Sequence, residues 1–223
     1  MKKSPFDVFI LLSILSILLL TSCWCREPVC KEERTGWSFD DDRIGSIPPG
    51  WLPAETGGKG TPATWEVVPG AIAITKNPNA GSTYNLLLAK GTRFKNGRIK
   101  VRVKAVAGKE DQGGGPIWRA QDANNYYIAR WNPLEDNFRV YFVKDGNRTQ
   151  LGSAEVKTDA EVWHTIEISH RGTRMEAMFD GKKLIEVEDS TFQDGGMVGL
   201  WVKADGLTAF DDVMWGNLVK KTR

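Results

Sequence analysis

Hydrophobic and polar residues alternate along most of this chain with a period of two. The clearest run is residues 98–105, where Ile99, Val101, Val103 and Ala105 fall on one side and basic residues on the other. Successive side chains of a β-strand point to opposite faces, so this run predicts a half-buried antiparallel strand. We interpret its basic side (Arg98, Lys100, Arg102 and Lys104) as a solvated face and not as a ligand site.

Two pairs of strand-like runs are joined by an Asp-Gly dipeptide. Residues 138–143 are followed by Asp145-Gly146, and residues 174–179 by Asp180-Gly181. Both dipeptides predict tight hairpins, because Asp and Gly tolerate positive φ. Similar runs occur at residues 65–68, 71–75, 84–88, 117–121, 126–131, 163–170, 198–202 and 208–215. With no convincing helix after residue 22, the pattern predicts an all-β domain of two packed antiparallel sheets.

The amino terminus has the pattern of an export signal. Lys2 and Lys3 precede an apolar run over residues 8–20, which is short for a membrane-spanning helix. Leu20-Thr21-Ser22-Cys23 resembles the lipobox of bacterial lipoproteins, which implies cleavage before Cys23 and lipidation of that cysteine. We therefore expect a signal peptide at 1–22, a tether at 23–35 and a domain at 36–223, exported and lipid-anchored to the bacterial cell envelope, on its periplasmic or cell-surface side. An ordinary secretory signal is the alternative.

The net charge and the positions of the cysteines argue against a nucleic-acid-binding protein and against a domain held together by disulfides. Removal of Lys2, Lys3 and Asp7 lowers the formal net charge from +2 to +1, which gives no case for nucleic-acid binding. The three cysteines, Cys23, Cys25 and Cys30, all precede the domain, so disulfides do not hold it together. If Cys23 is lipidated, Cys25 and Cys30 could form a disulfide in an exported compartment, whereas a zinc site is disfavoured because no histidine is near.

Several motifs in the middle and at the end of the chain carry a family resemblance. They are Asp111-Gln112-Gly113-Gly114-Gly115, Trp118-Arg119, residues 122–127, residues 135–141, residues 146–149, residues 179–184, Gly199–Asp205 and Phe210–Val213. Together they resemble a concanavalin A-like jelly roll, similar to bacterial laminin G-like modules and to 3-keto-disaccharide hydrolase (family 16-like) domains. The resemblance covers residues 36–217 and implies this fold, whose members include lectins, adhesion modules and glycosidases.

The resemblance to family 16 glycosidases raises the question of catalysis. Those enzymes carry two glutamates flanking an aspartate on one strand, and retaining hydrolysis needs two carboxyl groups about 5 Å apart. Glu135 and Asp136 instead fall at an expected turn, and Glu186 and Glu188 run into a loop. We therefore expect a non-catalytic protein, with a hydrolase of the 3-keto-disaccharide type as the alternative.

Strand parity identifies a candidate binding face. If Trp118, Val140, Leu200 and their same-parity neighbours face the core, the other parity presents aromatic and charged side chains outward. The candidate carbohydrate-binding residues are Arg119, Gln121, Arg130, Arg139, Tyr141, Trp201, Lys203 and Asp205. Such a mixture suits a sugar, whose C–H face packs on aromatic rings while its hydroxyls need donors and acceptors. A solvated sheet face and a surface for another protein are the alternatives. If these residues bind a carbohydrate, replacing Trp201 with Ala should abolish glycan binding without unfolding the domain.

Acidic residues near both ends of the domain suggest a metal site. Asp40 lies near its start, and Asp211 and Asp212 lie near its end. The resemblance implies a structural calcium in this region, and calcium prefers clustered oxygen ligands. The alternative is that these aspartates cap turns and strand ends.

Overall fold

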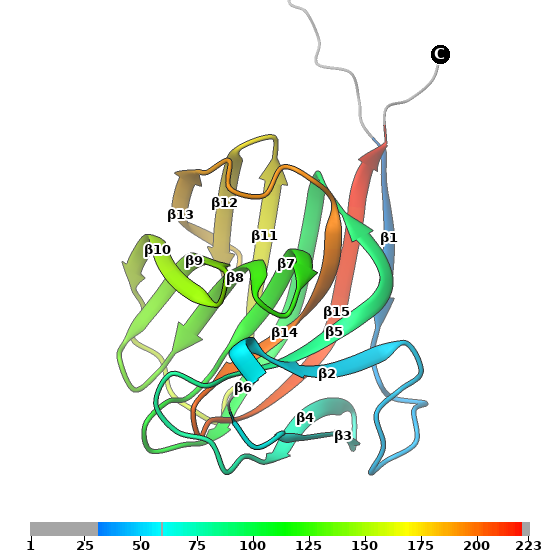
Figure 1. The fold of residues 1–223 in the computed structure, drawn as a ribbon, viewed down its shortest axis with the longest axis vertical. Coiled ribbons are helices and arrows are strands. Elements are labelled where there is room, and N and C mark those ends of the chain that lie inside the picture. The colour runs from blue at the N-terminus through cyan, green and yellow to red at the C-terminus, as the bar shows by residue number, and fades with distance from the viewer. Residues whose placement is uncertain (1–30, 59, 220–223) are drawn as a thin grey trace, which may run out of the picture.

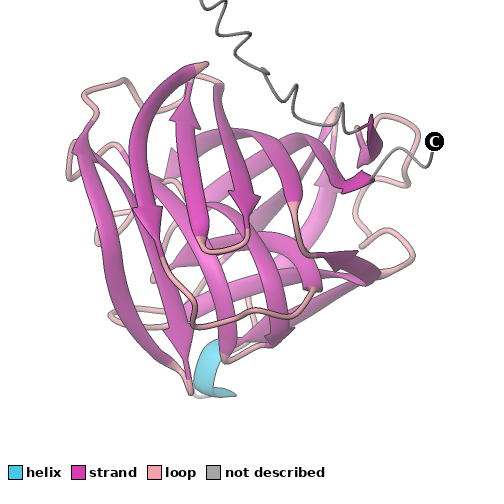
Figure 2. Cartoon of the chain, turned by 90° about the horizontal axis from the view of Figure 1, so that it is seen from above, coloured by secondary structure: helices cyan, strands magenta, loops and turns pink. Residues whose placement is uncertain are grey.

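The computed structural model describes residues 31–58 and 60–219, which form two antiparallel β-sheets and a single short 3-10 helix (Figures 1 and 2). The eight-stranded sheet runs β13 (Lys182–Glu188), β12 (Arg174–Phe179), β11 (His164–Arg171), β6 (Gly97–Ala107), β15 (Leu207–Val219), β4 (Ala71–Lys76), β3 (Thr64–Val68), with β1 (Lys31–Trp37) paired to β15. The seven-stranded sheet runs β10 (Asn147–Glu155), β9 (Asn137–Lys144), β8 (Asn125–Asn132), β7 (Gly115–Asp122), β14 (Gly196–Lys203), β5 (Tyr84–Phe94), β2 (Trp51–Glu55). The helix η1 (Thr56–Gly58) follows β2. The expected two-sheet sandwich is confirmed.

The main hydrophobic core lies between the two sheets. Ile99, Val101 and Val103 of β6 are fully buried there, opposite Trp118 of β7 and Leu200 of β14. The period-two pattern that predicted one buried side of β6 is therefore confirmed. Burial of this apolar surface is the main favourable contribution to folding.

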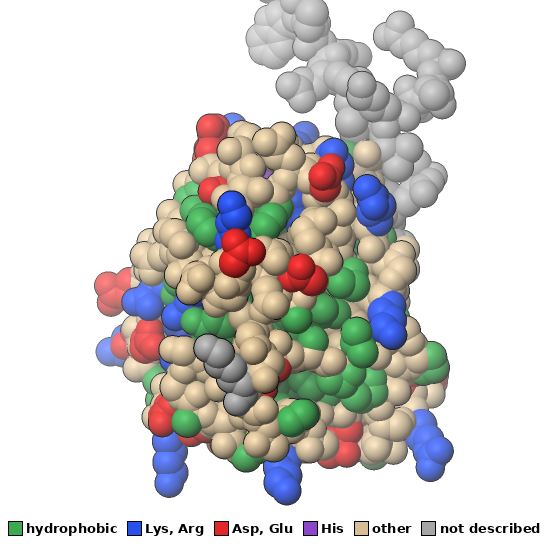
Figure 3. Space-filling view, viewed as in Figure 1, with side chains coloured by type: hydrophobic (Ala, Val, Ile, Leu, Met, Phe, Trp, Pro, Cys, Tyr) green, Lys and Arg blue, Asp and Glu red, His purple; other side chains and the backbone are tan. Residues whose placement is uncertain are grey.

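A second apolar cluster covers the other side of the seven-stranded sheet. Its members have the opposite strand parity from the main core: Tyr84, Leu86, Leu88, Ile117, Ala120, Tyr126, Ile128, Tyr141, Val143 and Trp201. We call this side the outer face of the seven-stranded sheet. In the view of Figure 3, hydrophobic side chains gather over the β5–β2 edge, beside charged and polar ones.

Both predicted Asp-Gly hairpins are present. Asp145 and Gly146 join β9 to β10 with φ of 51° and 78°, and Asp180 and Gly181 join β12 to β13 with φ of 47° and 78°. Positive φ at both central residues gives a turn whose twist matches that of the flanking strands. The first of these hairpins also borders the candidate site described below.

Two edge strands were not predicted. Residues 31–35, expected in the tether, belong to β1, which pairs with β15 from Lys31 opposite Val219 to Trp37 opposite Val213. The β1 sequence is charged and does not alternate, but main-chain pairing with β15 does not require alternation. β2 contains Pro53, which is tolerated because β2 lies at a sheet edge.

The expected signal peptide, Cys23 with its lipobox, Cys25 and Cys30 lie outside the described residues. Among the residues that the structure does describe, no helix is both long and apolar enough to span a bilayer.

Candidate functional site

Aromatic side chains from four strands meet on the outer face of the seven-stranded sheet. The rings of Tyr84 on β5 and Trp201 on β14 lie 5.2 Å apart, and the Trp201 Nε1–H donates a hydrogen bond to the Tyr126 hydroxyl at 3.1 Å. The Arg148 guanidinium, on β10, lies 4.5 Å from the centre of the Tyr141 ring and within 6 Å of Tyr84 and Trp201. Stacking of a cation on aromatic faces is favourable. Trp201 has no exposed surface in this cluster.

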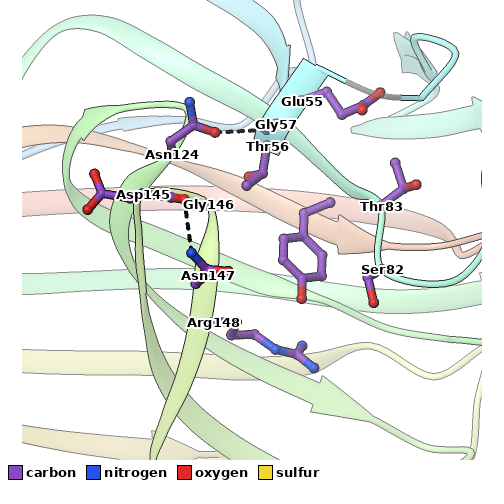
Figure 4. Close-up of a pocket in the computed structure, with 11 residues that line it drawn as sticks. Glu55, Thr56, Gly57, Ser82, Thr83, Asn124, Asp145, Gly146, Asn147 and Arg148 are labelled. Atoms are coloured by element: carbon purple, nitrogen blue, oxygen red, sulfur yellow. Dashed lines mark hydrogen bonds between the residues drawn. The ribbon is translucent and has the colours of Figure 1, made fainter.

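A cavity of about 730 Å³ opens beside this cluster (Figure 4). It is lined by Glu55, Thr56, Gly57, Ser82, Thr83, Tyr84, Asn124, Asp145, Gly146, Asn147 and Arg148. Most of these residues carry hydroxyl, amide or charged groups, and Tyr84 supplies an aromatic ring. The volume lies within the range of about 300–1,000 Å³ that is usual for small-molecule sites.

The residues of η1, Thr56–Gly58, close one side of the cavity; we call them the strap. The Thr56 hydroxyl donates to the Ala123 carbonyl oxygen at 2.8 Å and shares a second hydrogen bond of 2.8 Å with the Tyr126 hydroxyl. The Gly57 amide donates to Asn124 Oδ1 at 2.7 Å. Ala123 and Asn124 form the β7–β8 turn, so the strap ties the edge strand β2 to this turn.

A network of ion pairs lies on the same face of the sheet. Arg130 Nη2 is 2.6 Å from Asp111 Oδ2 and 3.2 Å from Glu135 Oε1, and both Arg130 and Asp111 are 1% exposed. Lys203 Nζ lies 3.0 Å from Asp111 Oδ2, and Arg139 Nη1 lies 3.0 Å from Glu135 Oε2. The network thus has three cations and two carboxylates.

Glu135 is held as a carboxylate by its neighbours. Burial alone would raise the pKa of Glu135, but hydrogen bonds from Arg130 and Asn137, with the charges of Arg130 and Arg139, outweigh it and bring the pKa to about 2. Burial would lower the pKa of Arg130, but the charge and hydrogen bond of Asp111, together with those of Glu135, outweigh burial and raise that pKa. Neither group is suited to exchanging protons near neutral pH, so the network can supply fixed charge and hydrogen bonds.

Five of the eight predicted binding residues lie together on the outer face. Arg130, Arg139, Tyr141, Trp201 and Lys203 have the predicted parity, but only Arg139 and Lys203 keep partly exposed side chains. Arg130 is buried in its ion pairs, and Arg148 lies over the Tyr141 and Trp201 rings. These five side chains therefore lie on the face that strand parity predicted. Parity alone does not predict how much of that face is buried.

The other three predicted residues, Arg119, Gln121 and Asp205, do not line the cavity. Arg119 has φ of 47° at a bulge in β7, and its guanidinium donates to the carbonyl oxygens of Lys95, Phe192 and Gly172. The bulge breaks the alternation that the parity argument assumed, and Arg119 is 1% exposed. Its burial lowers the pKa of this guanidinium.

Gln121 and Asp205 form hydrogen bonds with backbone groups and do not line the cavity. Gln121 donates to the carbonyl oxygen of Arg119 and borders a separate hollow near Gly195 and Met197. The Asp205 carboxylate accepts hydrogen bonds from the backbone amides of residues 109–111. Asp205 therefore fixes the loop that carries Asp111 and does not face the cavity.

Sequence reasoning missed Arg148, Asp111 and Thr56. Arg148 lies two residues after Gly146, near the start of the second hairpin strand, and that position could be predicted from the sequence. Its contacts with Tyr84 of β5 and Trp201 of β14 could not, because they depend on the fold. Asp111 and Thr56 lie outside regular strand patterns. Both lie in segments between strands, and the alternation of hydrophobic and polar residues does not predict the path of such segments.

The aspartates expected to bind calcium do not form a ligand cluster. Asp211 Oδ2 is paired with Arg102 Nη1 at 2.8 Å, and Asp212 lies 3.7 Å from the same guanidinium nitrogen. Burial and the nearby charges of Asp212 and Asp40 raise the pKa of Asp211. Within residues 31–58 and 60–219, no group of three His, Cys, Asp or Glu side chains could hold a metal ion. The structural calcium therefore remains a prediction.

Comparisons with solved structures find the same fold in carbohydrate-related proteins. The carbohydrate-binding module CBM66 from Bacillus subtilis is 18% identical, with a TM-score of 0.62, over 74% of this chain and 93% of that one. The laminarinase from Rhodothermus marinus is 16% identical, with a TM-score of 0.64, over 86% and 99%. A β-1,3-1,4-glucanase (lichenase) derived from a mouse hindgut metagenome is 13% identical, with a TM-score of 0.61, over 83% and 99%. At these identities the likeness establishes the jelly-roll fold alone.

A family model described as 3-keto-alpha-glucoside-1,2-lyase-like domain matches residues 38–215. A comparison with curated proteins found no match.

Proposed function

Because this chain belongs to the family of 3-keto-alpha-glucoside-1,2-lyase-like domains, we propose that the outer face of its seven-stranded sheet binds a carbohydrate. The observation that carries the proposal is the cavity beside Arg148, where a half-buried guanidinium stacked on aromatic rings adjoins hydroxyl and amide side chains. A saccharide needs such donors and acceptors to replace the water it loses on binding.

The lining of the cavity matches a polyol better than an apolar ligand. Ser82, Thr83, Asn124 and Asn147 offer neutral donors and acceptors, and Glu55 and Asp145 offer acceptors for sugar hydroxyls. Arg148 lines the cavity, and its buried Nη1 has no hydrogen-bond partner among the described residues, so we propose that this guanidinium donates to a ligand oxygen. The carbohydrate-binding module and the two glucanases of the same fold lend support by analogy.

Calorimetric titration tests this proposal. The panel is maltose, trehalose and sucrose, with the 3-keto form of each. At least one of these sugars should bind, and Arg148→Ala should weaken its binding by at least about tenfold, or 1.4 kcal/mol. The matched control is Arg171→Ala, which removes an exposed arginine from the eight-stranded sheet and should leave binding unchanged. Equal losses in the two variants, or no binding by the wild-type protein, would contradict the proposal.

A second function, cleavage of a 3-keto glycoside by elimination, is favoured by the family match. A ketone at C3 makes the proton on C2 acidic. A base removes that proton, its electron pair forms a C1=C2 double bond, the bond from C1 to the aglycone oxygen breaks, and that oxygen takes up a proton. This route needs no carboxylate nucleophile, so it does not require the two-glutamate strand of the family 16 enzymes.

Glu55 and Asp145 are the carboxylates that line the cavity, so we propose them as candidates for the base. Nitrophenol release from p-nitrophenyl 3-keto-α-glucoside, but not from its unoxidised parent, would support elimination, and Glu55→Gln or Asp145→Asn should abolish it. Cleavage of neither compound, or of both at equal rates, would count against it.

We also propose that the protein is exported and anchored to the bacterial envelope through a lipid on Cys23, as the lipobox-like segment suggests. In detergent phase partitioning of cell extracts, the full chain should enter the detergent phase. Cys23→Ser should move it to the aqueous phase. If both proteins partition alike, the anchor is not at Cys23.

A further inference from the structure

The strap crosses the outer face of the seven-stranded sheet. It follows directly after β2, the edge strand, but it forms hydrogen bonds with the β7–β8 turn. In the sheet, β5 and β14 lie between β2 and β7. Tyr126, which shares a hydrogen bond with Thr56, belongs to the outer-face cluster, so the strap passes above this side of the sheet (Figures 1 and 4).

The β9–β10 turn reinforces this crossing. A side-chain carbon placed on Gly146 would lie 3.8 Å from both Asn124 Oδ1 and Thr56 Cγ2. The Gly146 amide also donates to the Asn124 carbonyl oxygen at 3.1 Å. The strap, the β7–β8 turn and the β9–β10 turn are therefore in mutual contact, and they form one wall of the cavity beside Arg148.

We propose that the strap determines ligand specificity by closing this end of the outer face, so that the cavity takes the end of a saccharide and not the middle of a chain. This inference rests on the proposed carbohydrate-binding function. A chain running across the face at this point would have to break the Thr56 and Gly57 hydrogen bonds or pass through the backbone of the strap. A terminal sugar can instead enter beside Arg148 without disturbing them.

Two ligands with equal numbers of glucose units test the inference on the wild-type protein. β-Cyclodextrin and maltoheptaose contain the same number of α-1,4-linked glucose units, but only maltoheptaose has chain ends. Calorimetry should give tighter binding of maltoheptaose by at least about tenfold, the equivalent of one or two hydrogen bonds. Equal binding of the two would overturn the role of the strap while leaving carbohydrate binding intact. Binding of neither would overturn this inference, whereas the proposed function is tested separately by the disaccharide panel.

Removing the hydrogen bonds that hold the strap should reduce the preference for maltoheptaose over β-cyclodextrin. The double variant Thr56→Val and Asn124→Ala removes the side-chain groups that hold it, and the preference for maltoheptaose should fall to within about threefold if those hydrogen bonds hold the wall closed. The matched control is Thr149→Val, an exposed threonine on β10 outside the strap and the cavity lining. Circular dichroism confirms folding of each variant, and the single variant Asn124→Ala serves if the double variant does not fold. An unchanged preference in a folded, untied variant would contradict the inference.

Discussion

At the residue scale, the side chains of the outer face differ mainly in whether they support the face or remain available to a ligand. Trp201 and Tyr126 are buried and bonded to each other, whereas Arg148 lies over the rings and borders the cavity. Arg148 and Tyr84 are thus the members of this group that line the cavity. The rings below fix its position.

This assignment reverses the expectation from sequence for Trp201. Trp201→Ala should lower the free energy of unfolding by about 3–5 kcal/mol, because it removes a fully buried ring and leaves Tyr126 without its donor. Denaturant unfolding measures the loss. Trp163→Ala, which removes a half-buried indole from the other sheet, should cost clearly less. Wild-type stability in Trp201→Ala, with only binding lost, would restore the original expectation.

His170 gives the domain a pH dependence. Burial, aided by the charge of Arg119, lowers the pKa of His170 from 6.5 to about 3, and its Nδ1 accepts a hydrogen bond from Trp118 Nε1. As the pH falls from about 6.5 to 4.5, the unfolded chain takes up this proton and the folded chain does not, so the free energy of unfolding decreases by at most about 1.4 kcal/mol per pH unit.

His170→Asn, which cannot take up that proton, should show a shallower decrease in the free energy of unfolding over the same pH window. Chemical denaturation at pH 7.0, 5.5 and 4.5 gives both slopes. Parallel slopes for the wild-type and variant proteins would mean that His170 is not held neutral in the fold.

At the element scale, the strands with regular alternation were predictable and the edge strands were not. The β6 pattern identifies its buried side because one face must meet the core. β1 is held mainly by main-chain pairing with β15, which leaves little trace in sequence. The bulge at Arg119 shows the limit of parity reasoning, since one residue with positive φ reverses the side to which its neighbours point.

β1 should contribute measurably to stability although its sequence resembles a tether. A chain that begins at residue 38 should have a lower melting temperature than one that begins at residue 31, because the deletion removes the pairing with β15 and the contact of Trp37 with Trp51 at 4.8 Å. Differential scanning calorimetry compares the two chains. Equal melting temperatures would mean that residues 31–37 act only as a tether.

At the scale of the whole molecule, the two sheets have different roles. The core between them gives a rigid sandwich, and the outer face of the seven-stranded sheet carries the cavity, the strap and the ion-pair network. Sequence parity was enough to identify that face, because it depends only on which residues meet the core. It could not identify the cavity, whose walls come from turns and from η1, brought together by the fold.

The most direct test of carbohydrate binding at this face is a crystal structure of the protein with the tightest-binding saccharide of the panel. We predict a sugar ring in the cavity, with an oxygen atom within hydrogen-bond distance of the Arg148 guanidinium and the ring against the wall that the strap and the two turns form. A saccharide bound instead on the outer side of the eight-stranded sheet, with this cavity empty, would contradict it.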